Sequence, residues 1–158
     1  MTDLFTETPT KREIYFEVPG EVRGKGRPKT RIIPGAKPFA TIYTDAKTKK
    51  YEMRIADCAM RAKGDAKWAM IMDETPLRVD VLAIFAIPKS RSKKDRAALD
   101  GQFALNRIDG DNVIKALLDA CQDILFADDK VVAIMTVTKR WTADLNGECL
   151  KVRVSTCA

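Results

Sequence analysis

The chain has 158 residues, of which 46% are hydrophobic, and a formal net charge of +6, which suits a single globular domain. It contains no histidine, so histidine-dependent triads and histidine–metal sites are excluded, and any hydrolysis must use carboxylates, lysine or a metal held by oxygen. Four cysteines without a C-x-x-C pair, no apolar run that could span a membrane and no secretory signal predict a reduced, cytoplasmic protein.

The first third of the chain predicts two strands separated by a basic loop. Residues 1–12 are polar and are expected to form a flexible tail, so the single domain is expected to cover residues 13–158. Residues 13–18 place apolar side chains at every second position, which is typical of a half-buried strand. Residues 23–37 hold three glycines and two prolines and are expected to be a loop, whereas residues 38–43 predict a second strand.

The central part of the chain predicts two amphipathic helices around a buried strand. Between Thr44 and Gly64, apolar side chains recur every four residues, which indicates one face of a helix. Residues 79–87 are apolar on both faces and predict a central strand. Residues 89–107 form a long polar connection, and residues 111–125 place apolar side chains along one face of a second helix.

The C-terminal part of the chain predicts two strands, at residues 131–141 and 149–154, joined by a hairpin turn at Asn146-Gly147. The predicted order is strand, strand, helix, strand, helix, strand, strand. This order indicates the α+β class, with a mixed, mostly antiparallel sheet of about five strands and two main helices.

The positive charge is concentrated in the N-terminal part of the chain. Residues 1–67 contain 15 Lys and Arg against 9 Asp and Glu, whereas residues 68–158 contain 13 of each kind. Residues 23–37 carry six basic and no acidic side chains, and residues 88–96 carry five basic and one acidic side chain. Such local positive fields attract polyanions, above all nucleic-acid backbones. A solvated basic face that keeps the protein soluble would explain the charge equally well.

Acidic side chains surround the second predicted helix. Asp109 and Asp111 lie at its start, where free N–H groups favour negative charge, and Lys115 lies one turn after Asp111. Asp128 and Asp129 follow the helix, which spans roughly 21 Å, so they reach the first pair only if the chain folds back. If the acids converge, they form an all-oxygen site suited to Mg²⁺ and to phosphodiester hydrolysis. Lys115 would then stabilise the charge of the transition state or orient the water.

The same residues also have an ordinary structural interpretation. Asp111 could cap the helix, Asp109 and the pair at 128–129 could be turn residues, and Lys115 could form a surface ion pair with Asp111 or Asp119. Two independent features weigh against this interpretation. The chain is basic where DNA would bind, and it is rich in acid around the one helix where a metal would bind.

The segment RIDGDNVIKALLDACQDILFADDKVV, at residues 107–132, resembles the RusA family of Holliday junction resolvases. The family pattern is D-x-D-N-x-x-K-x-x-x-D-A, followed by a double Asp that leads into a strand. The positions that match it are Asp109, Asp111, Asn112, Lys115, Asp119, Ala120, Asp128 and Asp129. The upstream GKGRPKTR and the later TKRW are also similar to family segments, so the resemblance covers the chain from about residue 14 onward.

The resemblance implies a homodimer that binds four-way DNA junctions and cuts two strands symmetrically with Mg²⁺, for which Mn²⁺ could substitute. Two active sites related by a two-fold axis match the near two-fold symmetry of such a junction. The resemblance also implies that Asp109, Asp111 and Asp129 are metal ligands and that Lys115 is an essential lysine. Partners other than DNA and a second copy are not expected, nor is a membrane or a small-molecule cofactor. The source could be a bacterium or a phage.

The basic segment supplies the expected DNA contacts. Four side chains are expected to hold backbone phosphates: Lys25, Arg27, Lys29 and Arg31. Two other functions remain open at this point. One is a catalytically silent DNA-binding or recombination-accessory protein that shares the fold. The other is a nuclease without junction preference, which acts on flaps or single strands.

Overall fold

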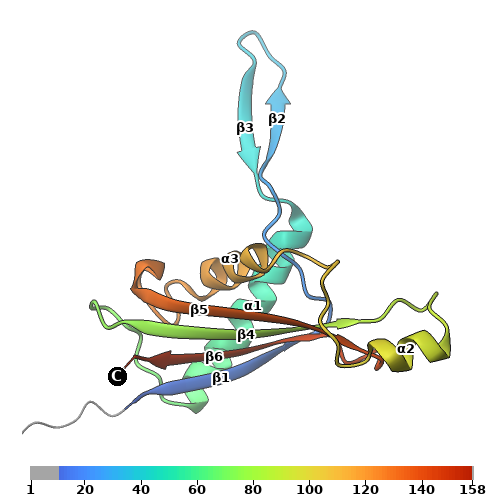
Figure 1. Ribbon diagram of the computed structural model, residues 1–158. Coiled ribbons are helices and arrows are strands. Elements are labelled where there is room, and N and C mark those ends of the chain that lie inside the picture. Colours follow the sequence, from blue (N-terminus) through green and yellow to red (C-terminus); the bar gives the residue numbers. More distant parts are fainter. Residues whose placement is uncertain (1–10, 158) are drawn as a thin grey trace, which may run out of the picture.

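The computed structural model describes residues 11–157 and contains two sheets and three α-helices (Figure 1). The predicted tail falls mostly on residues 1–10, which lie outside the described residues. The elements are β1 (Glu13–Pro19), β2 (Lys29–Ile33), β3 (Phe39–Tyr43), α1 (Ala46–Asp65), β4 (Leu77–Ala86), α2 (Lys93–Leu99), α3 (Gly110–Cys121), the short 3₁₀ turn η1 (Asp129–Val131), β5 (Val132–Thr142) and β6 (Cys149–Thr156). None of the described helices is long and apolar enough to cross a membrane.

The main sheet has four strands in the order β1-β6-β4-β5. β6 pairs antiparallel with both β1 and β4, whereas β5 pairs parallel with β4. The predicted α+β class with a mixed, mostly antiparallel sheet and two main helices is therefore confirmed, with the strands divided into a four-stranded sheet and a two-stranded ribbon. The predicted hairpin at Asn146-Gly147 is wrong. β4 lies between β5 and β6, so these two residues belong to a loop that connects strands on either side of β4.

The hydrophobic core lies between the four-stranded sheet and the helices α1 and α3. Every second residue of β1 is buried, as the alternation predicted, and α1 buries the side chains that recur every four residues. α3 buries seven of its 12 residues, and its helical span ends at Cys121, four residues before the predicted end. The core holds α3 rigidly against the sheet, so the polar residues at the two ends of this helix have fixed positions.

The basic segment is not a simple loop, because residues 29–33 form β2, which pairs with β3. The two strands form an antiparallel ribbon that projects away from the four-stranded sheet (Figure 1). All five residues of β2 are exposed, so the strand has no buried face to produce an alternating pattern. Backbone pairing alone defines this strand, which is why the sequence pattern did not reveal it.

The polar connection at residues 89–107 also contains regular structure, in the form of α2. The Ser92 hydroxyl accepts a hydrogen bond from the backbone N–H of Asp95 at 3.1 Å and so caps the helix. α2 buries none of its residues, and without a buried face it leaves no periodic apolar signal. Residues 101–104 then run along the outer edge of β5 and hydrogen-bond to Lys139 and Trp141.

Candidate active site

Two exposed carboxylates lie at the N-terminus of α3. Asp109 is the N-cap residue, and its carbonyl accepts from the N–H groups of Asn112 and Val113 at 3.1 and 3.2 Å. The Asp109 carboxylate makes no capping hydrogen bond, and Asp111 lies in the first turn of the helix. The positive end of the helix dipole stabilises both negative charges. The Asp109 carboxylate is not used to cap the helix, so it is available to a ligand.

Lys115 accompanies this acidic pair, as its spacing predicted. Its Nζ lies 3.1 Å from Oδ2 of Asp111, one helical turn away, and both side chains are well exposed. The hydrogen bond from Lys115 lowers the pKa of the Asp111 carboxyl, with smaller contributions from the charge of Lys115 and the local backbone. Asp111 therefore stays ionised near neutral pH, and Lys115 brings a mobile positive charge to the same surface.

The start of the basic segment packs directly on this helix turn. The backbone N–H of Lys25 donates to the carbonyl of Asn112 at 2.8 Å. A Cβ at Gly24 would lie 2.6 Å from Cγ2 of Ile108 and 2.9 Å from Cβ of Asn112, so only glycine fits at this point. Gly24 thus allows the basic segment to approach the backbone beside Asp109. This close packing brings the basic segment and the acidic pair together, although they are far apart in the sequence.

The four predicted phosphate contacts have different surroundings. Lys25 bridges the two long helices, with Nζ 2.7 Å from Glu52 on α1 and 2.6 Å from Asp119 on α3. Partial burial disfavours its charge, but the hydrogen bonds to these two carboxylates outweigh that effect and raise its pKa. Lys29 lies 3.6 Å from Asp45 and remains largely exposed. Within residues 11–157, Arg27 and Arg31 form no ion pair.

The second acidic pair lies beyond the other end of α3 (Figure 1). The chain does turn after the helix, but residues 125–127 hydrogen-bond to Ile71, which holds them beside the C-terminal end of α3. α3 has 12 residues, so about 18 Å of helix separates Asp129 from Asp109. The separation measured along β5 is similar. Gly110, next to Asp109, lies against Val137, because a Cβ placed on Gly110 would be 3.4 Å from that side chain. Val137 is five residues beyond the start of β5, and Asp129 lies before that start.

The predicted three-carboxylate cluster is therefore not assembled inside one chain. Across residues 11–157, no group of three or more His, Cys, Asp or Glu side chains is placed to hold a metal ion. Asp109 and Asp111 fit part of a magnesium site, because they offer exposed carboxylate oxygens, and Mg²⁺ usually keeps several waters beside one or two carboxylates. A third carboxylate would have to come from elsewhere.

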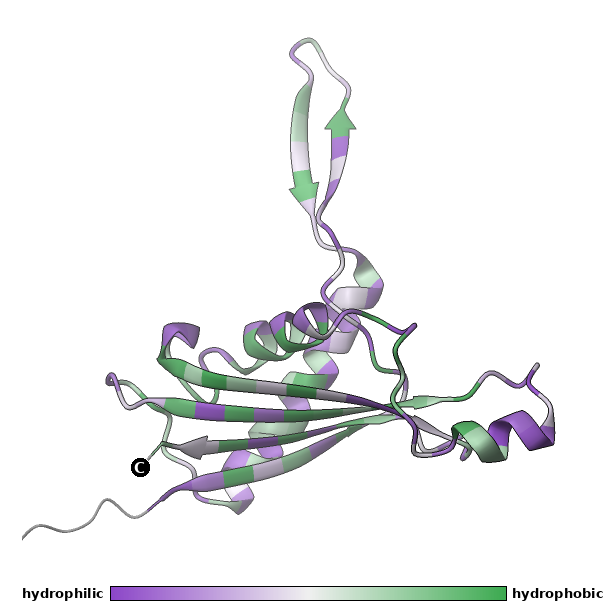
Figure 2. Cartoon of the chain, viewed as in Figure 1, coloured by the Kyte–Doolittle hydropathy of each residue, from purple (hydrophilic) through white to green (hydrophobic). Residues whose placement is uncertain are grey.

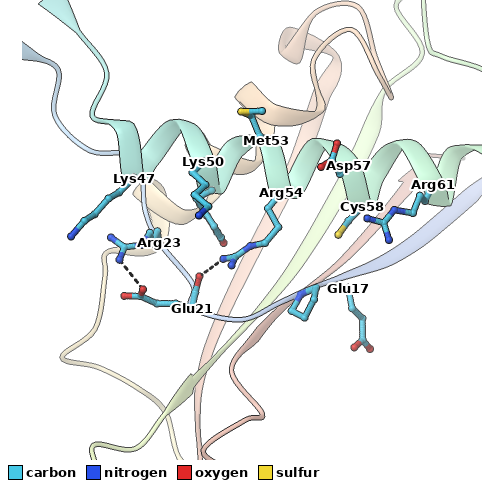
Figure 3. Close-up of a pocket in the computed structure, with 12 residues that line it drawn as sticks. Glu17, Glu21, Arg23, Lys47, Lys50, Met53, Arg54, Asp57, Cys58 and Arg61 are labelled. Atoms are coloured by element: carbon cyan, nitrogen blue, oxygen red, sulfur yellow. Dashed lines mark hydrogen bonds and ion pairs between the residues drawn. The ribbon is translucent and has the colours of Figure 1, made fainter.

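A second basic surface follows α1 and was not predicted from the sequence. Figure 3 shows an open groove whose wall includes four cations of this helix and Arg23. The helix cations are Lys47, Lys50, Arg54 and Arg61. Arg23 and Arg54 are both engaged by Glu21, through its carboxylate and its carbonyl respectively. The sequence did contain a signal for this row of cations, called the α1 stripe below. The four side chains are separated by three, four and seven residues, which places them on one face of the predicted helix.

Comparison with known proteins supports the sequence resemblance. The family model described as Endodeoxyribonuclease RusA matches residues 19–154, which is most of the chain. A comparison with curated proteins finds no match. The matched span includes the acidic pair, Lys115, the projecting ribbon and the α1 stripe, so it covers every feature of the candidate site. The chain therefore belongs to the RusA family of Holliday junction endodeoxyribonucleases and is a nuclease.

Proposed function

We propose that this protein resolves four-way DNA junctions by paired, symmetric nicking in DNA recombination and repair, with Mg²⁺ as its cofactor and Mn²⁺ as a substitute. Nucleases of this family typically need a divalent metal. The observation that carries the proposal is the packing of Gly24 and Lys25 against the helix turn that bears Asp109 and Asp111. The proposed DNA-binding segment and the proposed metal-binding pair thus meet at the first turn of α3.

Each residue at the start of α3 has a proposed role. Asp109 and Asp111 would hold the divalent ion, which when bound would supply a polarised water and offset the charge of the phosphate. Lys115 leaves Asp111 when DNA arrives and donates to the scissile phosphate, where it stabilises the charge that develops in the transition state. The mobility that this role requires is consistent with its exposed position and its single ion pair.

A homodimer is proposed because β5 offers an open edge. β5 is the outer strand of the sheet, and residues 101–104 cover only its far end. The preceding stretch exposes 42% of Ile134 and 52% of Met135. An open edge with exposed apolar side chains readily pairs with another strand. A second copy of the chain, related by a two-fold axis, is the proposed occupant of this edge.

Such a dimer would also account for the distant third carboxylate. If two β5 strands pair antiparallel along the stretch that residues 101–104 leave free, the start of one strand approaches the middle of the other. Asp129 lies three residues before β5, whereas Val137, in the middle of β5, lies against Gly110 between the two acids. Asp129 of the partner subunit would then complete the ligand set of Asp109 and Asp111. This arrangement would make metal binding depend on dimer formation.

The proposal is tested by incubating the purified protein with a synthetic four-way junction and Mg²⁺. Paired symmetric nicks are expected from the wild type. Asp109→Asn and Asp111→Asn should bind the junction but lose nicking, whereas Asp65→Asn, at the exposed end of α1, should cut normally. Binding without product would instead indicate the accessory protein, and equal rates on junction, flap and linear duplex would indicate a nuclease without junction preference. Wild-type cutting by either α3 variant would overturn the site assignment.

A further inference from the structure

The β2–β3 ribbon has two chemically different faces. Residues that lie directly opposite each other in an antiparallel pair share a face, and successive residues alternate between faces. The register therefore places the pairs Lys29–Tyr43, Arg31–Thr41 and Ile33–Phe39 on one face. The pairs Thr30–Ile42 and Ile32–Ala40 lie on the other face. The first face carries two cations and two aromatic rings, whereas the second carries no charge.

The aromatic side chains of the first face are free to receive a ligand. Phe39 is 59% exposed and Tyr43 is 44% exposed, although aromatic rings of this size are usually covered in a folded protein. The four-residue step between them spans roughly 13 Å, with Arg31 and Thr41 in the interval. Figure 2 shows hydrophobic and hydrophilic residues side by side on this ribbon, away from the core. Among the described residues, Phe39 and Tyr43 do not belong to the hydrophobic core, so packing does not explain why these two rings lie on the surface.

We infer that this face of the ribbon binds unpaired or unstacked nucleotides, with Phe39 and Tyr43 stacking on bases and Lys29 and Arg31 holding the adjoining phosphates. Residues 29–43 contain three basic and no acidic side chains, so the ribbon favours a polyanion. Cations interleaved with aromatic rings are the equipment for binding single strands, because every base offers a face on which a ring can stack. Bases inside a linear duplex are already stacked, so the ribbon distinguishes a branch point from a duplex.

The root of the ribbon places this surface near the proposed chemistry. The chain enters β2 three residues after Gly26, directly from the Gly24–Lys25 contact with the first turn of α3. It leaves β3 into α1, whose N-cap is Asp45. A strand held on the ribbon can therefore continue to Asp109 and Asp111. The inference deepens the proposed function, since a branch point is where a four-way junction exposes weakly stacked bases.

The test compares the two faces of the ribbon. Phe39→Ala combined with Tyr43→Ala removes the rings, and Ile32→Ala combined with Ile42→Ala is the matched control, because those side chains are 69% and 72% exposed on the opposite face. Binding is measured without divalent metal, using a junction with 2-aminopurine at the branch point, a single-stranded oligonucleotide and a linear duplex. Melting temperatures should stay unchanged, because the substituted side chains lie outside the core.

Loss of the two rings should weaken binding to the junction and to the single strand by about tenfold or more. It should also abolish the change in 2-aminopurine fluorescence and leave duplex binding unchanged, while the control variant should behave as the wild type. Unchanged junction and single-strand binding without the rings would overturn the inference. An equal loss in the control, with a change in sedimentation, would also overturn it and assign the ribbon to contacts between copies. If the wild type lacks junction preference but its single-strand binding needs the rings, the junction proposal fails and the ribbon assignment stands.

Discussion

The ammonium group of Lys115 lies 3.1 Å from the carboxylate of Asp111, one turn earlier on α3. If this pair opens so that Lys115 serves the phosphate, Lys115→Met should lower the nicking rate about 100-fold or more, with little change in junction affinity. Lys151→Met is the control, because Lys151 also forms an exposed ion pair, with Glu17 at 3.2 Å, but away from α3. Single-turnover nicking by both variants checks the prediction, and similar rates would mean that the Lys115 pair is only structural.

The separation of Asp129 from Asp109 leads to a second prediction. Asp109→Asn and Asp129→Asn should each be inactive as homodimers. A mixed dimer of the two variants should regain one intact site, because one protomer keeps Asp109 and its partner keeps Asp129. It should therefore nick one strand of a junction. Differently tagged protomers, purified as the mixed species, allow this measurement, and inactivity of the mixture would place each site within one chain.

The contrast between Arg31 and Lys25 gives a third prediction. Arg31→Gln should leave the free energy of unfolding unchanged and remove about one phosphate contact from the DNA complex. The slope of log K for DNA binding against log salt concentration should therefore change by about 0.9. Lys25→Met leaves Glu52 and Asp119 without their shared cation, so it should lower the free energy of unfolding by roughly 1 kcal/mol. Denaturant titrations and binding at several salt concentrations separate the two effects. A larger stability loss for Arg31→Gln would contradict the assignment.

Asp80, in the middle of β4, should contribute to acid stability. Its carboxylate accepts hydrogen bonds from Arg78, Thr136 and Arg153, and the Arg78 contact is the largest cause that keeps its pKa far below the ordinary range. Because the folded-state pKa is lowered, the stabilisation is complete above the unfolded pKa of about 3.9 and is lost as the pH falls below it.

Asp80→Asn should therefore destabilise the protein by about 1–2 kcal/mol at neutral pH and flatten the decline of stability below about pH 4. Urea unfolding at several pH values measures both effects. A variant with the same acid profile as the wild type would show that other carboxylates govern this range.

The buried thiol of Cys121 gives a prediction independent of DNA. Burial raises its pKa to about 12, whereas Cys58, Cys149 and Cys157 are only partly covered. In the native protein, an aromatic disulfide reagent should modify the three partly covered thiols and spare Cys121. The remaining thiol should react when denaturant is added. Rapid modification of all four cysteines in the native state would contradict the packing of α3 against the sheet.

The sequence predicted those elements that bury one face, and it predicted which polar side chains lie within one turn of each other on α3. The alternation of β1 and the stripe of α3 both reflect contact with the core, and Asp109, Asp111 and Lys115 are related by helix geometry alone. β2 and α2 bury nothing, so their hydrogen bonds leave no hydrophobic pattern. The position of Asp129 depends on hydrogen bonds between Ile71 and residues 125–127, which are distant in sequence. No local pattern encodes such a long-range contact.

The place of β6 in the sheet has a consequence for biosynthesis. Among the described strands β6 is the last to be made, yet it lies between β1 and β4, both of which are made much earlier. Until residues 149–156 leave the ribosome, β1 has no neighbour in the sheet and β4 has an open edge, so the core cannot close. Folding must then wait for contacts of high sequence separation. A nascent chain that lacks this strand carries the acidic pair of α3 without the framework that positions it, so we expect nuclease activity only after β6 has joined the sheet.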